Sequence, residues 1–92
     1  MMFAAKIRMN SGCEDSNTVL DIHSIYVIGY IEDKYLTVEE IHDYLRNHPN
    51  SIKADVFPYS FLIPMTGPDG KRYVQSTNNE SGYDTLMELP RG

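Results

Sequence analysis

The chain has 92 residues, 41% of them hydrophobic and 23% charged, with a formal net charge of −5 and a single cysteine. This length leaves room for one domain with one core, and a lone cysteine excludes an internal disulfide framework. The acidic balance opposes non-specific binding to nucleic acid, which depends on lysine and arginine replacing the counterions of phosphates. Because no apolar stretch is long enough for a signal peptide or a membrane span, we expect a cytoplasmic protein without membrane contact.

The charges are distributed unevenly along the sequence. Residues 13–43 contain eight of the 13 acids but one of the eight bases, so the rest of the chain carries five acids and seven bases. We interpret the acidic stretch as a solvated face that keeps a small protein soluble. The alternative is a dipolar surface that steers a basic protein partner.

The N-terminal part predicts two strands. Residues 3–9 alternate between apolar and polar side chains, which is typical of a half-buried strand. Residues 20–31 are apolar and β-branched on both faces, which favours a central strand covered on both sides by a helix and a second copy of the chain. The side of the first strand expected to be buried consists of Phe3, Ala5, Ile7 and Met9.

A short helix is predicted after this region. Thr37 and Glu40 have the spacing of a capping box, in which each side chain bonds to the backbone amide of the other residue. Pro49 ends the helix near Arg46 or Asn47. The side chains that share one face at helical spacing are Val38, Ile41, Tyr44 and Leu45.

The C-terminal half predicts strands over residues 52–57, 61–63 and 71–77. Pro64 places the second of these at a sheet edge or a bulge, because proline donates no hydrogen bond to a ladder. The whole pattern predicts one α+β domain over residues 1–92. We expect a small, mainly antiparallel sheet, with elements in the order β-β-α-β-β-β and one helix packed on it.

Two further local signals lie in this half. The sequence Gly67-Pro68-Asp69-Gly70 predicts a hairpin turn, in which Gly70 takes the left-handed conformation. Near the end of the sequence, three apolar residues are expected to clamp the chain onto the core. They are Leu86, Met87 and Leu89.

Six short motifs occur along the chain. They are Ala-Lys-Ile-Arg-Met at 5–9, Ser-Gly at 11–12, Asp-Ile-His-Ser-Ile at 21–25, Gly-Lys-Arg-Tyr-Val-Gln-Ser-Thr at 70–77, Asn-Asn-Glu at 78–80 and Asp-Thr-Leu-Met-Glu-Leu-Pro at 84–90. Together they resemble motifs of the domain-of-unknown-function family 3892 of small bacterial proteins, and the chain departs from the family pattern at Arg72, Val74 and Thr85. The resemblance implies a unit of this size and no activity to carry over.

The residues that carry enzymatic chemistry are poorly placed for it. Cys13 is followed by two acids, which disfavour the thiolate that a nucleophile with His23 would need. His42 and His48 are six residues apart on the predicted helix, so they do not face one metal ion. We therefore predict no catalytic residue, no metal site and no cofactor.

The residues that favour binding are basic and aromatic. Lys71 and Arg72 beside Tyr73 form the densest group of this kind, suited to a phosphate, a nucleotide or an acidic partner. The seven tyrosines exceed what so small a core holds, so we expect some of them, with Tyr30 and Tyr35 as candidates, to line a homodimer or partner surface.

These observations favour a small non-enzymatic module that binds a protein partner and forms a homodimer. The alternative is a binder of a small anionic ligand or nucleotide signal, such as a phage or mobile-element antagonist of host defence. An enzyme ranks third, because the sequence has no paired carboxylates, triad or metal ligands at useful spacing.

Overall fold

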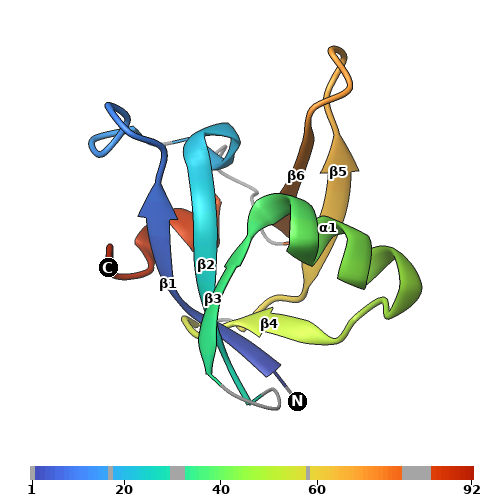
Figure 1. The fold of residues 1–92 in the computed structure, drawn as a ribbon. Helices are drawn as coiled ribbons and strands as arrows, with labels where there is room; N and C mark the ends of the chain where they lie inside the picture. The colour runs from blue at the N-terminus through green and yellow to red at the C-terminus, as the bar shows by residue number, and fades with distance from the viewer. Residues whose placement is uncertain (1, 17, 30–32, 58, 78–83) are drawn as a thin grey trace.

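The computed structural model describes residues 2–16, 18–29, 33–57, 59–77 and 84–92 (Figure 1). It contains one α-helix, six strands and two short 3₁₀ helices within these residues. The elements are β1 (Met2–Met9), η1 (Val19–Asp21), β2 (Ile22–Ile28), β3 (Lys34–Thr37), α1 (Val38–Asn47), β4 (Ile52–Ala54), β5 (Leu62–Thr66), β6 (Arg72–Ser76) and η2 (Thr85–Glu88).

The strands form two sheets. One has four strands in the order β3-β2-β1-β4, and the other is the β5–β6 hairpin. All pairings between these strands are antiparallel except that of β1 with β4. The predicted α+β class and its mainly antiparallel pairing are confirmed. The predicted order lacked β3, and the single expected sheet is in fact two. Four residues are too few to give a periodic signal, so β3 was not predicted although it directly follows β2 in the sequence.

The first strand is irregular, and the prediction of its buried face is partly wrong. Ala4 pairs with Val27 whereas Lys6 pairs with Tyr26, so Ala5 is an extra residue that forms a β-bulge. The bulge shifts the alternation by one position. Ala4 and Ile7 are therefore fully buried, while Phe3 and Ala5 are half-buried on the other side.

The second strand is central, as predicted, because it lies between β1 and β3. Ile25 and Val27 are buried in the core, and Tyr26 and Ile28 on the opposite face are half-buried. The strand is shorter than predicted: it begins after η1 and ends at Ile28, and residues 30–31 lie outside the described part of the chain. Cover of the opposite face by a second copy stays a prediction.

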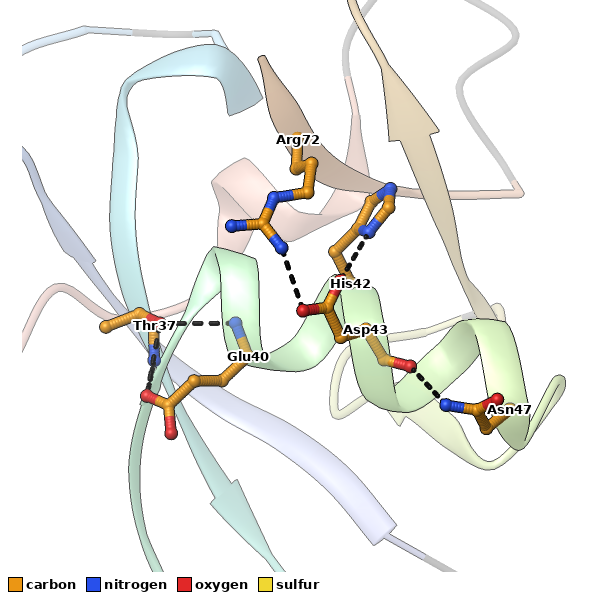
Figure 2. A network of polar contacts seen from close by, with 6 residues as sticks. All are labelled: Thr37, Glu40, His42, Asp43, Asn47 and Arg72. Carbon is orange, nitrogen blue, oxygen red and sulfur yellow. Dashed lines mark hydrogen bonds and ion pairs between the residues drawn. The ribbon is translucent and has the colours of Figure 1, made fainter. Parts of the chain in front are cut away.

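The predicted helix is confirmed at both ends. The Glu40 amide donates to Thr37 Oγ1 at 3.2 Å and the Thr37 amide donates to Glu40 Oε1 at 3.1 Å, which completes the capping box (Figure 2). The helix ends at Asn47, with His48 as C-cap. It lies against β2, β3 and the β5–β6 hairpin (Figure 1). Its buried residues are Val38, Ile41, His42 and Leu45.

The strands after the helix differ in length from the prediction. The strand expected over residues 52–57 is limited to 52–54, and the strand expected over 61–63 runs from 62 to 66 through Pro64. Proline is tolerated there because a two-stranded sheet consists of edge strands, so the side of Pro64 without a partner strand needs no N–H donor. Gly70 has φ +84°, which confirms the left-handed position of the predicted turn.

The C-terminal segment joins both sheets to one core. Asp84 accepts hydrogen bonds from the amides of Ser76 and Leu86, each at 2.9 Å, and so ties β6 to η2. The chain then pairs with the free edge of β1, where the Ile7 amide donates to the Pro90 carbonyl at 2.9 Å. The predicted clamp of Leu86, Met87 and Leu89 is buried in the same core as the sheet and the helix, which confirms that expectation.

Candidate functional site

The first predicted binding residues, Lys71 and Arg72, both make contacts within the chain. Lys71 Nζ donates to the Leu20 carbonyl oxygen at 2.6 Å, which holds the hairpin against η1. Arg72 Nη1 donates to Asp43 Oδ2 on α1 at 2.8 Å (Figure 2). Lys71 and Arg72 thus attach the hairpin to η1 and α1.

Asp43 has a second partner besides Arg72. Its Oδ1 lies 3.3 Å from Nδ1 of the buried His42 (Figure 2). The hydrogen bonds from His42 and then from Arg72 hold the pKa of Asp43 below the usual aspartate value. Arg72 and Asp43, with Arg46 and Asn47, border a shallow polar hollow. One negative and two positive side chains give this hollow a net charge of +1, and Arg72 is already paired with the aspartate.

The other predicted binding residues do not join this group. Tyr73 is half-buried in β6 opposite Met65. Tyr30 lies outside the described residues. Tyr35 lies in β3, where it pairs with Tyr26 on the side of the sheet that faces away from the core. The residues expected to form one site therefore belong to separate parts of the surface.

The side of the four-stranded sheet around Tyr35 is a second candidate, which we call the outer sheet face. Strand register places Lys6, Tyr26 and Tyr35 in one row across β1, β2 and β3. The two tyrosine rings lie 5.0 Å apart, centroid to centroid. Register also places Phe3 beside Lys53 of β4, and Lys53 opposite Phe61. We define the outer sheet face by Phe3, Lys6, Arg8, Tyr26, Tyr35, Lys53 and Phe61.

Each cation of this face lies over an aromatic ring. Arg8 Cζ is 4.0 Å from the centroid of the Tyr35 ring, Lys53 Nζ is 4.9 Å from that of Phe61, and Lys6 Nζ is 5.7 Å from that of Tyr26. Such contacts hold a cation by the ring quadrupole without neutralising it. The Arg8 Nε also donates to a main-chain oxygen of Gly92 at 3.3 Å. A Cβ at Gly92 would meet the Tyr35 hydroxyl and Lys6 Cδ, so Gly92 itself lies on this face.

The four strands of this sheet contain no aspartate or glutamate, although the chain has 13 acids. They contain Lys6, Arg8, Lys34 and Lys53. The helix, by contrast, carries three acids and one base. The sheet is therefore a positive and aromatic layer in a negative protein. The acid directly after β4 is the exposed Asp55, beside this layer.

Two strongly exposed aromatic residues lie in the loop that follows β4. Phe57 is 79% exposed and Tyr59 is 49% exposed, and their rings meet edge to face at 6.2 Å. Tyr59 has φ +60°, which is uncommon for an aromatic residue and costs free energy. In the sequence, these two residues lie between Lys53 and Phe61, which both belong to the outer sheet face. Exposed rings of this kind mark contact surfaces.

A third candidate is a cavity of about 230 Å³ between the sheet and the first turn of α1. Its lining is mainly apolar and includes Leu36, Ile41 and Ile52, with the charged side chains of Lys34 and Glu40 among the lining residues. Such a cavity suits a small, mostly apolar group.

The structure also places several of the residues that were considered for metal or thiol chemistry. Among them, no three side chains of histidine, cysteine, aspartate or glutamate gather in a way that could hold a metal ion. Cys13 lies half-buried in the loop between β1 and η1. None of the described helices is long and apolar enough to cross a bilayer.

The sequence predicted Tyr35 as a binding residue and counted Tyr26 among the surplus tyrosines, but it did not indicate Lys6, Arg8 or Lys53, which share their side of the sheet. One signal was present: Lys6 and Arg8 alternate with apolar residues, which puts both on one side of their strand. The pairing that brings them to the tyrosines is set by contacts between distant segments. Comparison of the chain with models of known families, with curated proteins and with solved structures finds no match. The resemblance to family 3892 stays a prediction.

Proposed function

We propose that this protein is a non-enzymatic module that binds a partner protein through its outer sheet face. The observation that carries the proposal is the gathering of cations on aromatic rings over one side of an acid-free sheet. Aromatic and arginine side chains dominate the energetics of protein interfaces, because they bury large areas and keep a polar group for specificity.

Two further features support this choice of surface. The exposed rings of Phe57 and Tyr59 lie between Lys53 and Phe61 in the sequence, and their contact with water is relieved when a partner covers them. The hairpin cations Lys71 and Arg72, in contrast, already bind Leu20 and Asp43. The partner can be a second copy of this chain, so homodimer formation through the same face is part of the proposal.

A small-molecule ligand is the second candidate function. The mainly apolar cavity between β3 and α1 favours it, because about 230 Å³ holds a compact organic group. The expected anionic ligand fits less well, since the lining contains Glu40 as well as Lys34. We rank this function below protein binding.

Site-specific photo-crosslinking in the source organism tests the proposal. A photoreactive phenylalanine analogue replaces Tyr26 or Tyr35 in one pair of variants, and Tyr73 in the matched control. We expect the same adduct from positions 26 and 35 and none from position 73. An adduct with twice the mass of the chain identifies a homodimer. Adducts from position 73 alone, or from none of the three positions, contradict the proposal.

A further inference from the structure

The strand β3 forms one edge of the four-stranded sheet and leads directly into α1 (Figure 1). Among the described residues, β2 is the only strand that pairs with it. The Thr37 amide donates to Glu40 of the helix, so it points away from β2. Backbone groups of alternate residues in a strand point to the same side, and the amide and carbonyl of Tyr35 therefore face the open edge as well. An unpaired edge is a template for a further strand.

The pairing of the neighbouring strands gives the same result. The amide and carbonyl of Ile7 bond to the C-terminal segment, so Ile25 opposite Ile7 directs its own backbone groups toward β3. There Ile25 pairs with Leu36. Leu36 thus uses its backbone groups toward β2, and those of the adjacent Tyr35 are directed to the open edge.

The cavity of about 230 Å³ borders this edge on the inner side of the sheet. Lys34 and Leu36 of β3 line it together with Glu40 and Ile41 of α1. Both hydrogen bonds that Glu40 accepts from Thr37 use Oε1, so Oε2 remains able to accept from a cation. The edge therefore combines open backbone groups with an apolar hollow that is lined by one positive and one negative side chain.

A second copy of the chain fits this edge in one register. Most homodimers have two-fold symmetry, so the two β3 strands run antiparallel about an axis through one residue. An axis at Lys34 sets two lysines opposite each other, which is destabilising. An axis at Leu36 requires the Thr37 amide, which the capping box already uses. An axis at Tyr35 uses the open amide and carbonyl of both copies, which exchange two hydrogen bonds.

The same register brings opposite charges together. Lys34 of one copy lies opposite Leu36 of the other copy, and both side chains are on the inner side of the sheet. Leu36 and Glu40 line the same cavity, so the Lys34 ammonium of one copy lies beside the Glu40 carboxylate of the other. Two-fold symmetry forms this contact twice. Charge complementarity of this kind selects one partner and one register.

We propose that two copies of this chain dimerise by antiparallel pairing of their β3 edges at Tyr35, with Lys34 of each copy bonded to Glu40 of the other. The two four-stranded sheets then become one sheet, in which the rows of Lys6, Tyr26 and Tyr35 meet at the axis. The dimer goes beyond the proposed function, because it rests on the strand edge and the cavity rather than on the outer sheet face.

Sedimentation velocity of two charge-reversed variants tests the dimer. Lys34→Glu places two acids at each charge contact, and Glu40→Lys places two lysines there. We expect a wild-type dimer, and a dissociation constant at least about tenfold higher for either variant alone. An equimolar mixture of the two variants has opposite charges at both contacts, so it is expected to regain the dimer.

Two further variants control this experiment. Lys71→Glu makes the same change of charge in the hairpin, and we expect a dissociation constant within about twofold of wild type, because Lys71 contacts η1 rather than β3. Glu40→Gln keeps the capping box but loses the charge, so it is expected to weaken the dimer without loss of the helix cap. Circular dichroism and urea unfolding verify that every variant folds.

A disulfide tests the register. Directly opposed residues of a hydrogen-bonded antiparallel pair have Cα atoms about 5.5 Å apart, which a disulfide spans. In a chain with Cys13→Ser, the additional change Tyr35→Cys is expected to give a disulfide-linked dimer on mild oxidation. Ser11→Cys in the same background, at an exposed loop position, is expected to stay monomeric over the same time.

A wild-type chain that stays monomeric up to about 1 mM overturns the inference. A Lys34→Glu dimer as tight as wild type, a monomeric mixture of the two charge-reversed variants, or equal disulfide yields at positions 35 and 11 also overturn it. Crosslinks of positions 26 and 35 to another protein, together with a monomeric chain, leave the proposed function standing without the dimer. Charge-dependent dimers with an adduct at position 35 alone support the dimer and count against a partner that covers the outer sheet face.

Discussion

Two basic and aromatic regions of this molecule have nearly the same composition but different surroundings. In the hairpin, Arg72 is paired with Asp43 and Lys71 with the Leu20 carbonyl. On the outer sheet face, Lys6 and Arg8 lie over tyrosine rings, on strands that contain no acid. The comparison teaches that a run of bases in the sequence does not identify a binding site. What matters is which partners the fold gives to the bases: Arg72 meets an aspartate, whereas Lys71 and Arg8 each meet a main-chain oxygen.

The largest expected effect concerns the core beneath the sheet. Ile7 is fully buried and its amide anchors the C-terminal segment, so Ile7→Ala is expected to lower the free energy of unfolding by about 2–5 kcal/mol. Urea denaturation measures the change. Arg8→Ala, at the adjacent exposed position, is the control and is expected to cost about 1 kcal/mol or less. Similar losses in the two variants contradict the assignment of the inner and outer sides of β1.

The next effect concerns the turn of the β5–β6 hairpin. Gly70 has φ +84°, and a Cβ there meets no atom within 4 Å, so Gly70→Ala introduces backbone strain without a clash. We expect a loss of about 1 kcal/mol in the free energy of unfolding. Asparagine tolerates the left-handed region better, so Gly70→Asn is expected to lose less. An unchanged midpoint for Gly70→Ala means that the turn has another conformation in solution.

A smaller effect on stability is expected from the charge pair between Arg72 of the hairpin and Asp43 of α1. Because the pKa of Asp43 is lowered in the folded protein, its pairing stabilises the fold at neutral pH, above the unfolded pKa. This stabilisation is lost as the pH falls through the pKa that Asp43 has in the folded protein. In Arg72→Ala, urea midpoints are therefore expected to fall less steeply below about pH 4 than in wild type. Parallel pH profiles of the two proteins contradict a lowered pKa that depends on Arg72.

The smallest effect lies within the sheet. Ser24 is 4% exposed, in the row of Arg8 and Thr37, and its hydroxyl has no hydrogen-bond partner among the described residues. Removal of an unsatisfied buried hydroxyl is nearly neutral or stabilising, so Ser24→Ala is expected to change the unfolding free energy by less than about 1 kcal/mol, with any change toward greater stability. A clear loss of stability, measured by thermal unfolding, indicates that the hydroxyl has a bonded partner in solution.

The parts of the fold that sequence analysis predicted are those specified by local chemistry. The capping box of Thr37 and Glu40 determines where α1 begins, and the turn at Pro68-Asp69-Gly70 determines the hairpin. The bulge at Ala5 was not predictable, because it depends on how β1 pairs with β2. β3 was missed for another reason, because its four residues are too few to show a periodic pattern.

The candidate site also combines features that the local sequence indicates with features that depend on strand pairing. The outward direction of Lys6 and Arg8 is visible in the alternation of one strand. Their position over Tyr26 and Tyr35 depends on the register of three strands, which no single segment encodes. Conversely, adjacency in the sequence suggested Lys71 and Arg72, and the packing of the hairpin against η1 and α1 gives both of them internal partners.

The most direct test of the binding surface is the yield of the photo-crosslinked adduct at position 35 relative to position 73, measured with and without the Lys6→Gln and Arg8→Gln changes. We predict a partner adduct at position 35 that falls strongly when the two cations are removed, and no adduct at position 73. An adduct at position 73 that is unaffected by these changes, without one at position 35, contradicts the account.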